Sequence, residues 1–171
     1  TIRIWSIEAN DMEAIVVNGH DDVVRGVEMF KYNKKIYIIS ASRDKTIKMW
    51  EMNGNKCTLN CTWKAHTKPV VALSSFVAQH AKIVSASNDK TLRIWDVNNR
   101  DQSIALKGHE KAISCVQVEM MGSKNVDKTE WIILSGSSDK SIRIWSLHDG
   151  VCLQIIKPFK KPVIKLSILK N

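Results

Sequence analysis

The segment TLRIWDV at residues 91–97 recurs along the chain with small changes, and each copy carries a tryptophan at the same position. The other copies are TIRIWSI at 1–7, TIKMWEM at 46–52 and SIRIWSL at 141–147. Their tryptophans are separated by 45, 45 and 50 residues and are Trp5, Trp50, Trp95 and Trp145. A period in this range is typical of a propeller or a solenoid, so the content of one unit decides between the two.

Each unit contains predicted β-strands. Two of them are short runs rich in Ile and Val with partial alternation. These pairs are IYIIS (36–40) with TIKMW (46–50), AKIVS (81–85) with TLRIW (91–95), and WIILS (131–135) with SIRIW (141–145). The polar sequences RDK, NDK and SDK separate the members of each pair, and Asp in such a turn hydrogen-bonds nearby backbone amides. Each pair is therefore predicted to be a hairpin.

One further apolar run precedes each hairpin and another follows it. The preceding runs, each introduced by Gly-His or Ala-His, are DVVRGVEMF (22–30), PVVALSSF (69–76) and AISCVQVE (112–119). The following runs are KCTLNCTW (56–63), QSIALK (102–107) and VCLQII (151–156). Four antiparallel strands in a unit of about 45 residues is the arrangement of a propeller blade.

These motifs resemble the WD-repeat family of β-propellers. The likeness covers essentially the whole chain and rests on the tryptophan-ended strands, the His dipeptides and the turn aspartates in constant register. Only Trp95-Asp96 has the dipeptide that names the family. The resemblance implies an all-β WD-repeat β-propeller, here a partial ring of about three complete four-stranded blades with incomplete blades at both ends.

The repeat register divides the chain into five parts. They are the end of an incomplete blade (1–18), three complete blades (19–64, 65–107 and 108–157) and the start of a further blade (158–171). Thr1 aligns with Thr46, which lies inside a hairpin, and KPVIKLSIL at 161–169 aligns with KPVVALSSF at 68–76 as a first strand. We expect a fragment of a longer protein, whose remaining blades are needed to close the ring.

Each complete unit also contains a Ser, a His and an Asp, the residue types of an acyl-transfer site. In all three units the serine precedes the aspartate by four residues and the tryptophan follows the aspartate by six, and an enzyme rarely needs three copies of one nucleophile. We therefore expect no catalysis. The resemblance implies a structural hydrogen-bond network in which the Trp N–H reaches Ser, the Ser hydroxyl reaches His, and His donates to Asp. The members are His20, Ser40, Asp44 and Trp50; His66, Ser85, Asp89 and Trp95; and His109, Ser135, Asp139 and Trp145.

A second serine lies two residues before each turn aspartate, so the identity of the serine member stays open between the two positions. The alternatives are Ser42, Ser87 and Ser137. Buried indole and hydroxyl groups need partners, because an unpaired one costs about 1–3 kcal/mol.

Other chemistry finds little support in the sequence. The histidines His20, His66 and His109 belong to successive units, too far apart for bonds near 2 Å to one ion. The stretch GSSDKS at 136–141 lacks the second glycine of a phosphate-binding loop, and its counterparts identify it as the repeated hairpin turn. We predict neither a metal site nor a cofactor.

Positions that vary between units while the frame is kept predict a partner-binding surface. In a propeller, the loop before the first strand and the turn between the second and third strands lie on one rim. The candidate rim residues are the lysines at matching turn positions, Lys45, Lys90 and Lys140, together with the variable positions Asp22, Arg43, Lys68, Asn88, Lys111 and Ser138. The insertion EMMGSKNVDKTE at 119–130 is expected to lengthen a loop on the opposite rim.

Composition and charge limit the function classes. The 171 residues are 44% hydrophobic and 25% charged, as in globular proteins. There is no apolar run of about 18 residues that would span a membrane, and we expect an intracellular protein, cytoplasmic or nuclear. The net charge is +9, but the last fifteen residues hold five lysines and no acid. We expect a non-catalytic scaffold that binds other proteins. The alternative is a subunit of a ribonucleoprotein or other nucleic-acid-associated complex.

Overall fold

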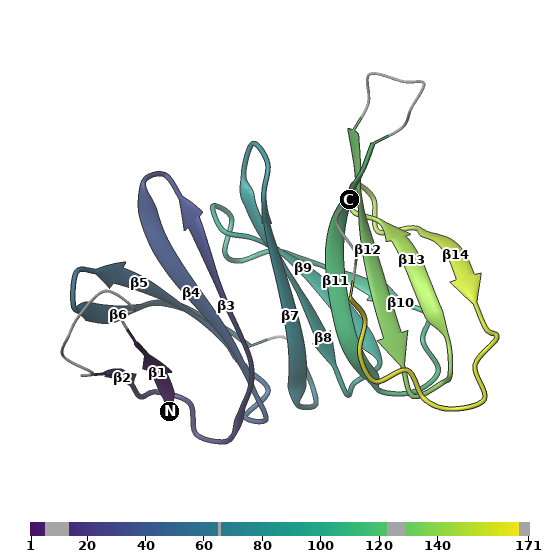
Figure 1. Cartoon of the computed structure of the whole chain (residues 1–171), viewed down its shortest axis with the longest axis horizontal. Coiled ribbons are helices and arrows are strands. Elements are labelled where there is room, and N and C mark those ends of the chain that lie inside the picture. Colours follow the sequence, from purple (N-terminus) through teal and green to yellow (C-terminus); the bar gives the residue numbers. More distant parts are fainter. Residues whose placement is uncertain (6–13, 65, 123–128, 168–171) are drawn as a thin grey trace.

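The computed structural model describes residues 1–5, 14–64, 66–122 and 129–167. All regular elements in these residues are β-strands, which form one two-stranded sheet and three four-stranded antiparallel sheets. Figure 1 shows the sheets side by side in an open arc. The expected all-β fold, a partial WD-repeat propeller, is confirmed. No helix in the described part of the chain is long and apolar enough to cross a bilayer.

Each four-stranded sheet is one blade, with its strands paired in sequence order. Blade 1 contains β3 (Val24–Tyr32), β4 (Lys35–Ser42), β5 (Ile47–Asn53) and β6 (Lys56–Trp63). Blade 2 contains β7 (Val70–Val77), β8 (Ala81–Ser87), β9 (Thr91–Asp96) and β10 (Ser103–Lys107). Blade 3 contains β11 (Ile113–Gly122), β12 (Thr129–Ser137), β13 (Ile142–Ser146) and β14 (Cys152–Ile156). The two-stranded sheet pairs β1 (Ile2–Ile4) with β2 (Ile15–Val17).

The second strands of blades 1 and 2 are buried on both faces because each lies between two neighbouring sheets. In β4, Ile38 packs with Trp50 toward the two-stranded sheet, while Ile39 belongs to the cluster between blades 1 and 2. In β8, Ile83 joins that same cluster and Val84 faces blade 3. Successive side chains of a strand point to opposite faces, so consecutive buried residues are what a strand packed on both sides requires.

The first strands of the blades are neighbours, with β3 next to β7 and β7 next to β11. Polar contacts join them. Ser75 donates to Glu28 Oε2 through its backbone N–H at 2.6 Å and its hydroxyl at 2.8 Å. The Val118 N–H donates to Ser74 Oγ at 3.1 Å. Burial raises the pKa of Glu28, although the hydrogen bonds from Ser75 oppose the rise.

The turns between the second and third strands of each blade have one repeated conformation. Their lysines have a positive φ, 71° at Lys45, 73° at Lys90 and 67° at Lys140. The backbone N–H of each lysine donates to the carbonyl of the serine three residues earlier. Glycine is favoured at such positions because it has no Cβ. These turns and the loops before β3, β7 and β11 form one edge of the arc, which we call the turn rim.

Two sequence expectations differ from the structure. We predicted a strand over 161–169, but no strand is present at 161–167, and 168–171 lie outside the described residues. Val163 does contact blade 3, because its N–H donates to the Ser137 carbonyl at 3.1 Å and its carbonyl accepts from Ser114 Oγ. A strand requires a continued ladder of backbone hydrogen bonds to a neighbour, and this segment has only isolated contacts to blade 3.

The second difference concerns the insertion at 119–130, which we expected to be a loop. Residues 119–122 continue β11 and residues 129–130 begin β12, so that Met120 pairs with Trp131. Residues 123–128 lie outside the described residues. Part of the insertion therefore lengthens the hairpin itself.

Candidate functional site

The residues of the expected network lie within hydrogen-bond distance in blade 1. His20 Nδ1 is 2.7 Å from Asp44 Oδ2, and His20 Nε2 is 2.7 Å from Ser40 Oγ. The indole Nε1 of Trp50 donates to the same Ser40 Oγ at 2.9 Å. This chain of contacts connects the loop before β3 with β4, β5 and the turn between them.

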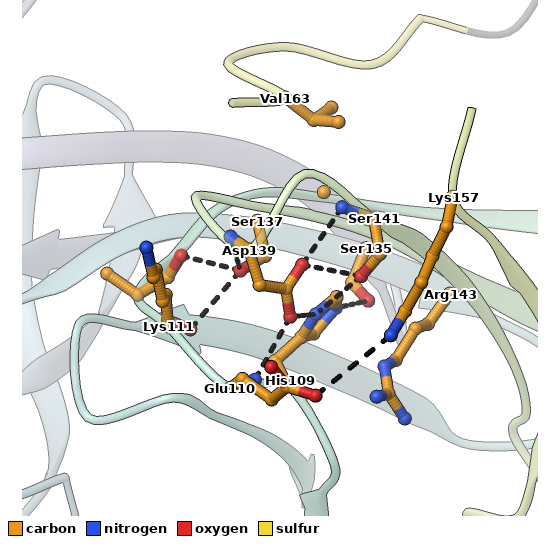
Figure 2. A network of polar contacts seen from close by, with 12 residues as sticks. His109, Glu110, Lys111, Ser135, Ser137, Asp139, Ser141, Arg143, Lys157 and Val163 are labelled. Atoms are coloured by element: carbon orange, nitrogen blue, oxygen red, sulfur yellow. Dashed lines mark hydrogen bonds and ion pairs between the residues drawn. The ribbon is translucent and has the colours of Figure 1, made fainter. Parts of the chain in front are cut away.

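Blades 2 and 3 repeat the geometry. In blade 2 the distances are 2.8 Å (His66 Nδ1 to Asp89 Oδ2), 2.7 Å (His66 Nε2 to Ser85 Oγ) and 2.9 Å (Trp95 Nε1 to Ser85 Oγ). In blade 3 they are 2.7 Å (His109 Nδ1 to Asp139 Oδ2), 2.7 Å (His109 Nε2 to Ser135 Oγ) and 2.8 Å (Trp145 Nε1 to Ser135 Oγ). Figure 2 shows His109, Ser135 and Asp139 of the third copy converging beneath the turn.

The second serine of each unit has a different set of contacts. Ser42 Oγ donates to the Asp22 carbonyl and accepts the backbone N–H of Asp44, both at 3.1 Å. Ser87 and Ser137 likewise connect the loop before the first strand with the turn. In this structure the indole N–H therefore reaches the first serine of each unit, and the second serine fastens the turn.

Each network contains a fifth residue, with a hydroxyl side chain, which we did not identify from the sequence. The hydroxyls of Thr46 and Thr91 donate to Oδ1 of the turn aspartate at 2.6 Å, and that of Ser141 does so at 2.5 Å. Each oxygen also lies 3.2–3.4 Å from the histidine Nδ1. The signal in the sequence is a hydroxyl residue two positions after every turn aspartate.

These contacts shift the titration of the aspartates. Burial opposes the ionisation of Asp44, but hydrogen bonds from Thr46, His20 and the Asp21 N–H outweigh it and lower its pKa to about 2. The pKa values of Asp89 and Asp139 are lowered in the same way, because hydrogen bonds outweigh burial. Burial lowers the pKa of His109, although its hydrogen bond to Asp139 opposes the decrease. The carboxylates are therefore ionised at neutral pH.

The burial of the network decides whether its serines are accessible as nucleophiles. The side chains of Ser40, Ser85 and Ser135 have no exposed surface, and each Oγ already contacts both an indole N–H and an imidazole. A serine nucleophile must approach the carbonyl carbon of a substrate, and these oxygens have no open path to one. Among the described residues, no three His, Cys, Asp or Glu side chains cluster as they would around a metal ion.

Register shifts place a second set of side chains at the turn rim. Each first strand has an irregular position near its start, where the residue is left out of the ladder: Arg25 in β3, Val71 in β7 and Ser114 in β11. A β-bulge re-aims the side chain of its unpaired residue. These positions could not be identified from the sequence, because a bulge leaves no constant residue type in the three units.

The three unpaired residues line one cavity of about 560 Å³ at the turn rim. Its remaining walls are Arg43, Pro69 and Asn88. Among the described residues, the lining thus includes two arginines and no acidic residue. Arg43 is partly neutralised, because its Nε lies 3.8 Å from Asp22 Oδ2 in an exposed pair. Arg25 makes no ion pair within the described residues, so the cavity favours a negatively charged partner group.

The other candidate rim residues do not line this cavity. Asp22 lies beside it through its contact with Arg43. Ser138 is half-buried in the turn of blade 3, and the remaining five side chains are exposed. These five are Lys45, Lys68, Lys90, Lys111 and Lys140. Of the nine predicted positions, the described structure therefore places Arg43 and Asn88 in the cavity wall and Asp22 in contact with Arg43.

The repeats match the sequence model of a known family and are similar to parts of two known proteins. The sequence model of the family described as "WD domain, G-beta repeat" matches residues 13–51, 57–96 and 100–146. The chain is 36% identical over 58 residues to nuclear distribution protein PAC1 of Yarrowia lipolytica, which covers 33% of the chain and 12% of PAC1. It is 34% identical over 77 residues to the ribosome biogenesis protein WDR12 homolog of Trichoplax adhaerens, a match that covers 43% of the chain and 17% of that relative. The matched segment thus spans less than a fifth of either relative.

Proposed function

This chain belongs to the WD-repeat family, and we propose that it is a non-catalytic scaffold that binds an acidic segment of another protein at the turn rim. The observation that carries the proposal is the cavity lined by Arg25 and Arg43, whose walls contain no acidic residue in the part of the chain that the structure describes. WD repeats in general bind other proteins, which supports this role. We place the protein inside the cell, in the cytoplasm or the nucleus, as the names of both relatives suggest.

The hydrogen-bond networks support the proposal by holding the rim in shape. Each network connects the loop before a first strand with the turn between the second and third strands. Three cavity residues, Arg43, Pro69 and Asn88, lie in these loops and turns of blades 1 and 2. A binding surface on loops needs a rigid support, because ordering a mobile loop on binding reduces the affinity. We propose that the networks serve this structural role.

A photo-crosslinking amino acid at position 71 tests the proposal in cells that express the protein. Val71 forms part of the cavity wall, so we expect a protein adduct of defined mass. The double variant Arg25→Glu and Arg43→Glu should abolish it, because like charges then face the acidic segment. The matched control is Lys34→Glu, an exposed lysine in the β3–β4 turn at the opposite rim, which should leave the adduct unchanged. Loss of the adduct in both variants would contradict the proposal.

The alternative is a subunit of a ribonucleoprotein complex. The name of one relative, a ribosome biogenesis protein, and the two cavity arginines support it. Phosphate contacts release counterions, so RNA binding weakens steeply as salt increases. An adduct at position 71 that disappears after ribonuclease treatment would favour this alternative over the protein scaffold.

A further inference from the structure

A groove of about 850 Å³ lies between blades 2 and 3, at the rim opposite the turn rim. Blade 2 contributes the end of β7, the β7–β8 turn and the start of β8. Blade 3 contributes the start of β12, the β13–β14 turn and the start of β14. Phe76 and Trp131 form an apolar part of the lining, with ring centroids 4.9 Å apart. The volume is in the range of sites that hold a peptide side chain or a small ligand.

The equivalent position between blades 1 and 2 is filled. The registers align Phe30 with Phe76 and hence Tyr32 with Ala78. Tyr32 packs against the core cluster shared by blades 1 and 2, and its hydroxyl accepts from Asn98 Nδ2 at 3.1 Å. In the groove the shorter Ala78 replaces the tyrosine.

His148 takes the place of Asn98 on the other wall. The alignment follows from a shared hydrogen bond, since the Val97 N–H donates to the Ala81 carbonyl and the Leu147 N–H donates to the Trp131 carbonyl, both at 3.1 Å. Residues 98 and 148 each follow these donors directly. The hydrogen bond between Tyr32 and Asn98 joins blades 1 and 2 at this position. Among the described residues, the interface between blades 2 and 3 has no equivalent hydrogen bond.

The apolar surface continues from the groove onto β14. Val151 and Leu153 line the groove and are 54% and 56% exposed, and Ile155 follows two residues later at 47%. β14 is the last strand of its sheet in the described structure. An exposed apolar row on an edge strand is suited to contact with an extended segment of another chain.

The polar groups of the groove favour a carboxylate on that segment. Lys82 lines the groove and makes no ion pair within the described residues. His80 is a further polar residue of the lining, and its Nδ1 lies 3.1 Å from Asn98 Nδ2. Asp149 is the one acidic residue of the lining, and its Oδ1 accepts the Val151 N–H within its own turn.

We propose that this groove binds an extended segment of a partner protein that presents a bulky apolar side chain next to an acidic residue. The apolar side chain occupies the space above Phe76 and Trp131, and the carboxylate pairs with Lys82. This surface is separate from the basic cavity of the turn rim, so the protein would contact two partner segments at once.

Two labelled peptides test the proposal on the full chain. The first is acetyl-Glu-Asp-Leu-Phe-Glu-Asp-amide, and the second carries lysine in place of every acidic residue. Fluorescence anisotropy measures the Kd, and the indole N–H resonance of Trp131, assigned with Trp131→Phe, reports the site. We expect the acidic peptide to bind at least about tenfold more tightly than the basic one and to shift the Trp131 resonance.

The matched variants are Ala78→Tyr and Ala78→Ser. Tyrosine should fill the groove as Tyr32 fills the first interface and raise the Kd at least about tenfold, whereas serine should keep it within about twofold. Lys82→Glu, a surface change that leaves the groove open, should reverse the preference between the two peptides. Arg43→Glu should leave binding unchanged, which separates this test from that of the turn rim.

Three results would overturn the proposal. They are equal binding of the two peptides, a Kd that Ala78→Tyr leaves unchanged, and the absence of any shift of the Trp131 resonance at saturating peptide. Sedimentation tests the other possible occupant of the groove, a second copy of this chain. Self-association that Ala78→Tyr abolishes would show that a second copy of the chain fills the groove, and would also overturn it.

Discussion

The Oγ of Ser40 accepts the indole N–H of Trp50 at 2.9 Å, across the ladder between β4 and β5. The same oxygen lies 2.7 Å from His20 Nε2. Ser40 has no exposed surface and Trp50 is 3% exposed, so water cannot replace the hydroxyl. One serine thus serves two buried polar groups in each blade.

Ser40→Ala should therefore leave both the indole N–H and the imidazole without their partner. Each unpaired buried group costs about 1–3 kcal/mol, and we expect the free energy of unfolding to fall by about 2–4 kcal/mol. Urea unfolding followed by tryptophan fluorescence measures the change. Ser138→Ala, in the turn of blade 3, is the control and should stay within about 0.5 kcal/mol of the unchanged protein. Equal stability of both variants would contradict a structural role for the network.

The turn aspartates predict that stability falls in acid. The pKa of Asp44 is lowered from 3.8 to about 2 by the hydrogen bonds it accepts in the folded state. A carboxylate with a lowered pKa stabilises the fold above its unfolded pKa, and this contribution is lost as the pH falls through the folded pKa. Unfolding by urea should therefore become easier as the pH decreases from about 4 to about 2.

The variant Asp44→Asn isolates this contribution. It should be less stable than the unchanged protein at pH 6 and should lose less stability between pH about 4 and about 2, because one of the titrating groups is gone. Asp89 and Asp139 remain and titrate in the same direction. Identical acid dependence of the two proteins would show that the hydrogen bonds to Asp44 do not contribute to stability.

The positive φ of Lys140 predicts a stabilising substitution. A residue with a Cβ costs about 1–2 kcal/mol in the left-handed region, while glycine costs about 0.5–1 kcal/mol in backbone entropy. Lys140→Gly keeps the hydrogen bond from the backbone N–H to the Ser137 carbonyl and should raise the free energy of unfolding by about 0.5–1 kcal/mol. Lys140→Ala retains the backbone strain, so it should not raise the free energy of unfolding. Thermal unfolding of both variants checks this, and a gain in alanine equal to that in glycine would contradict it.

Much of the blade architecture could be predicted because each unit repeats the same local chemistry. The run TIKMW and its counterparts pair with the run before them through a polar turn, and a spacing of 45 to 50 residues brings the same His, Ser, Asp and Trp positions into every complete unit. The choice between Ser40 and Ser42 could not be predicted. Both are buried hydroxyls two residues apart on one face of β4, and only their distances to Trp50 and to the Asp44 N–H separate them.

The predicted segment at 161–169 shows a different limit. Its sequence matches the first strand of blade 2, but residues 161–167 do not form a strand. Strand propensity describes how well a side chain fits a pleated surface, whereas the ladder itself needs a partner strand. In this segment Val163 hydrogen-bonds to blade 3 through its N–H and its carbonyl, but residues 161–167 form no continued ladder with a partner strand.

The sequence by itself determined the repeat, the strand order within each blade and the family, because these depend on hydrophobic alternation and turn residues that lie close together in the chain. Only the tertiary structure decided which side chains share a cavity. Arg25 reaches Arg43 and Asn88 through an irregular position in β3, and the groove beside Trp131 exists because Ala78 stands where the neighbouring interface has Tyr32. Both the cavity and the groove depend on how separate blades pack against one another. No local sequence pattern encodes the distance between side chains of different blades.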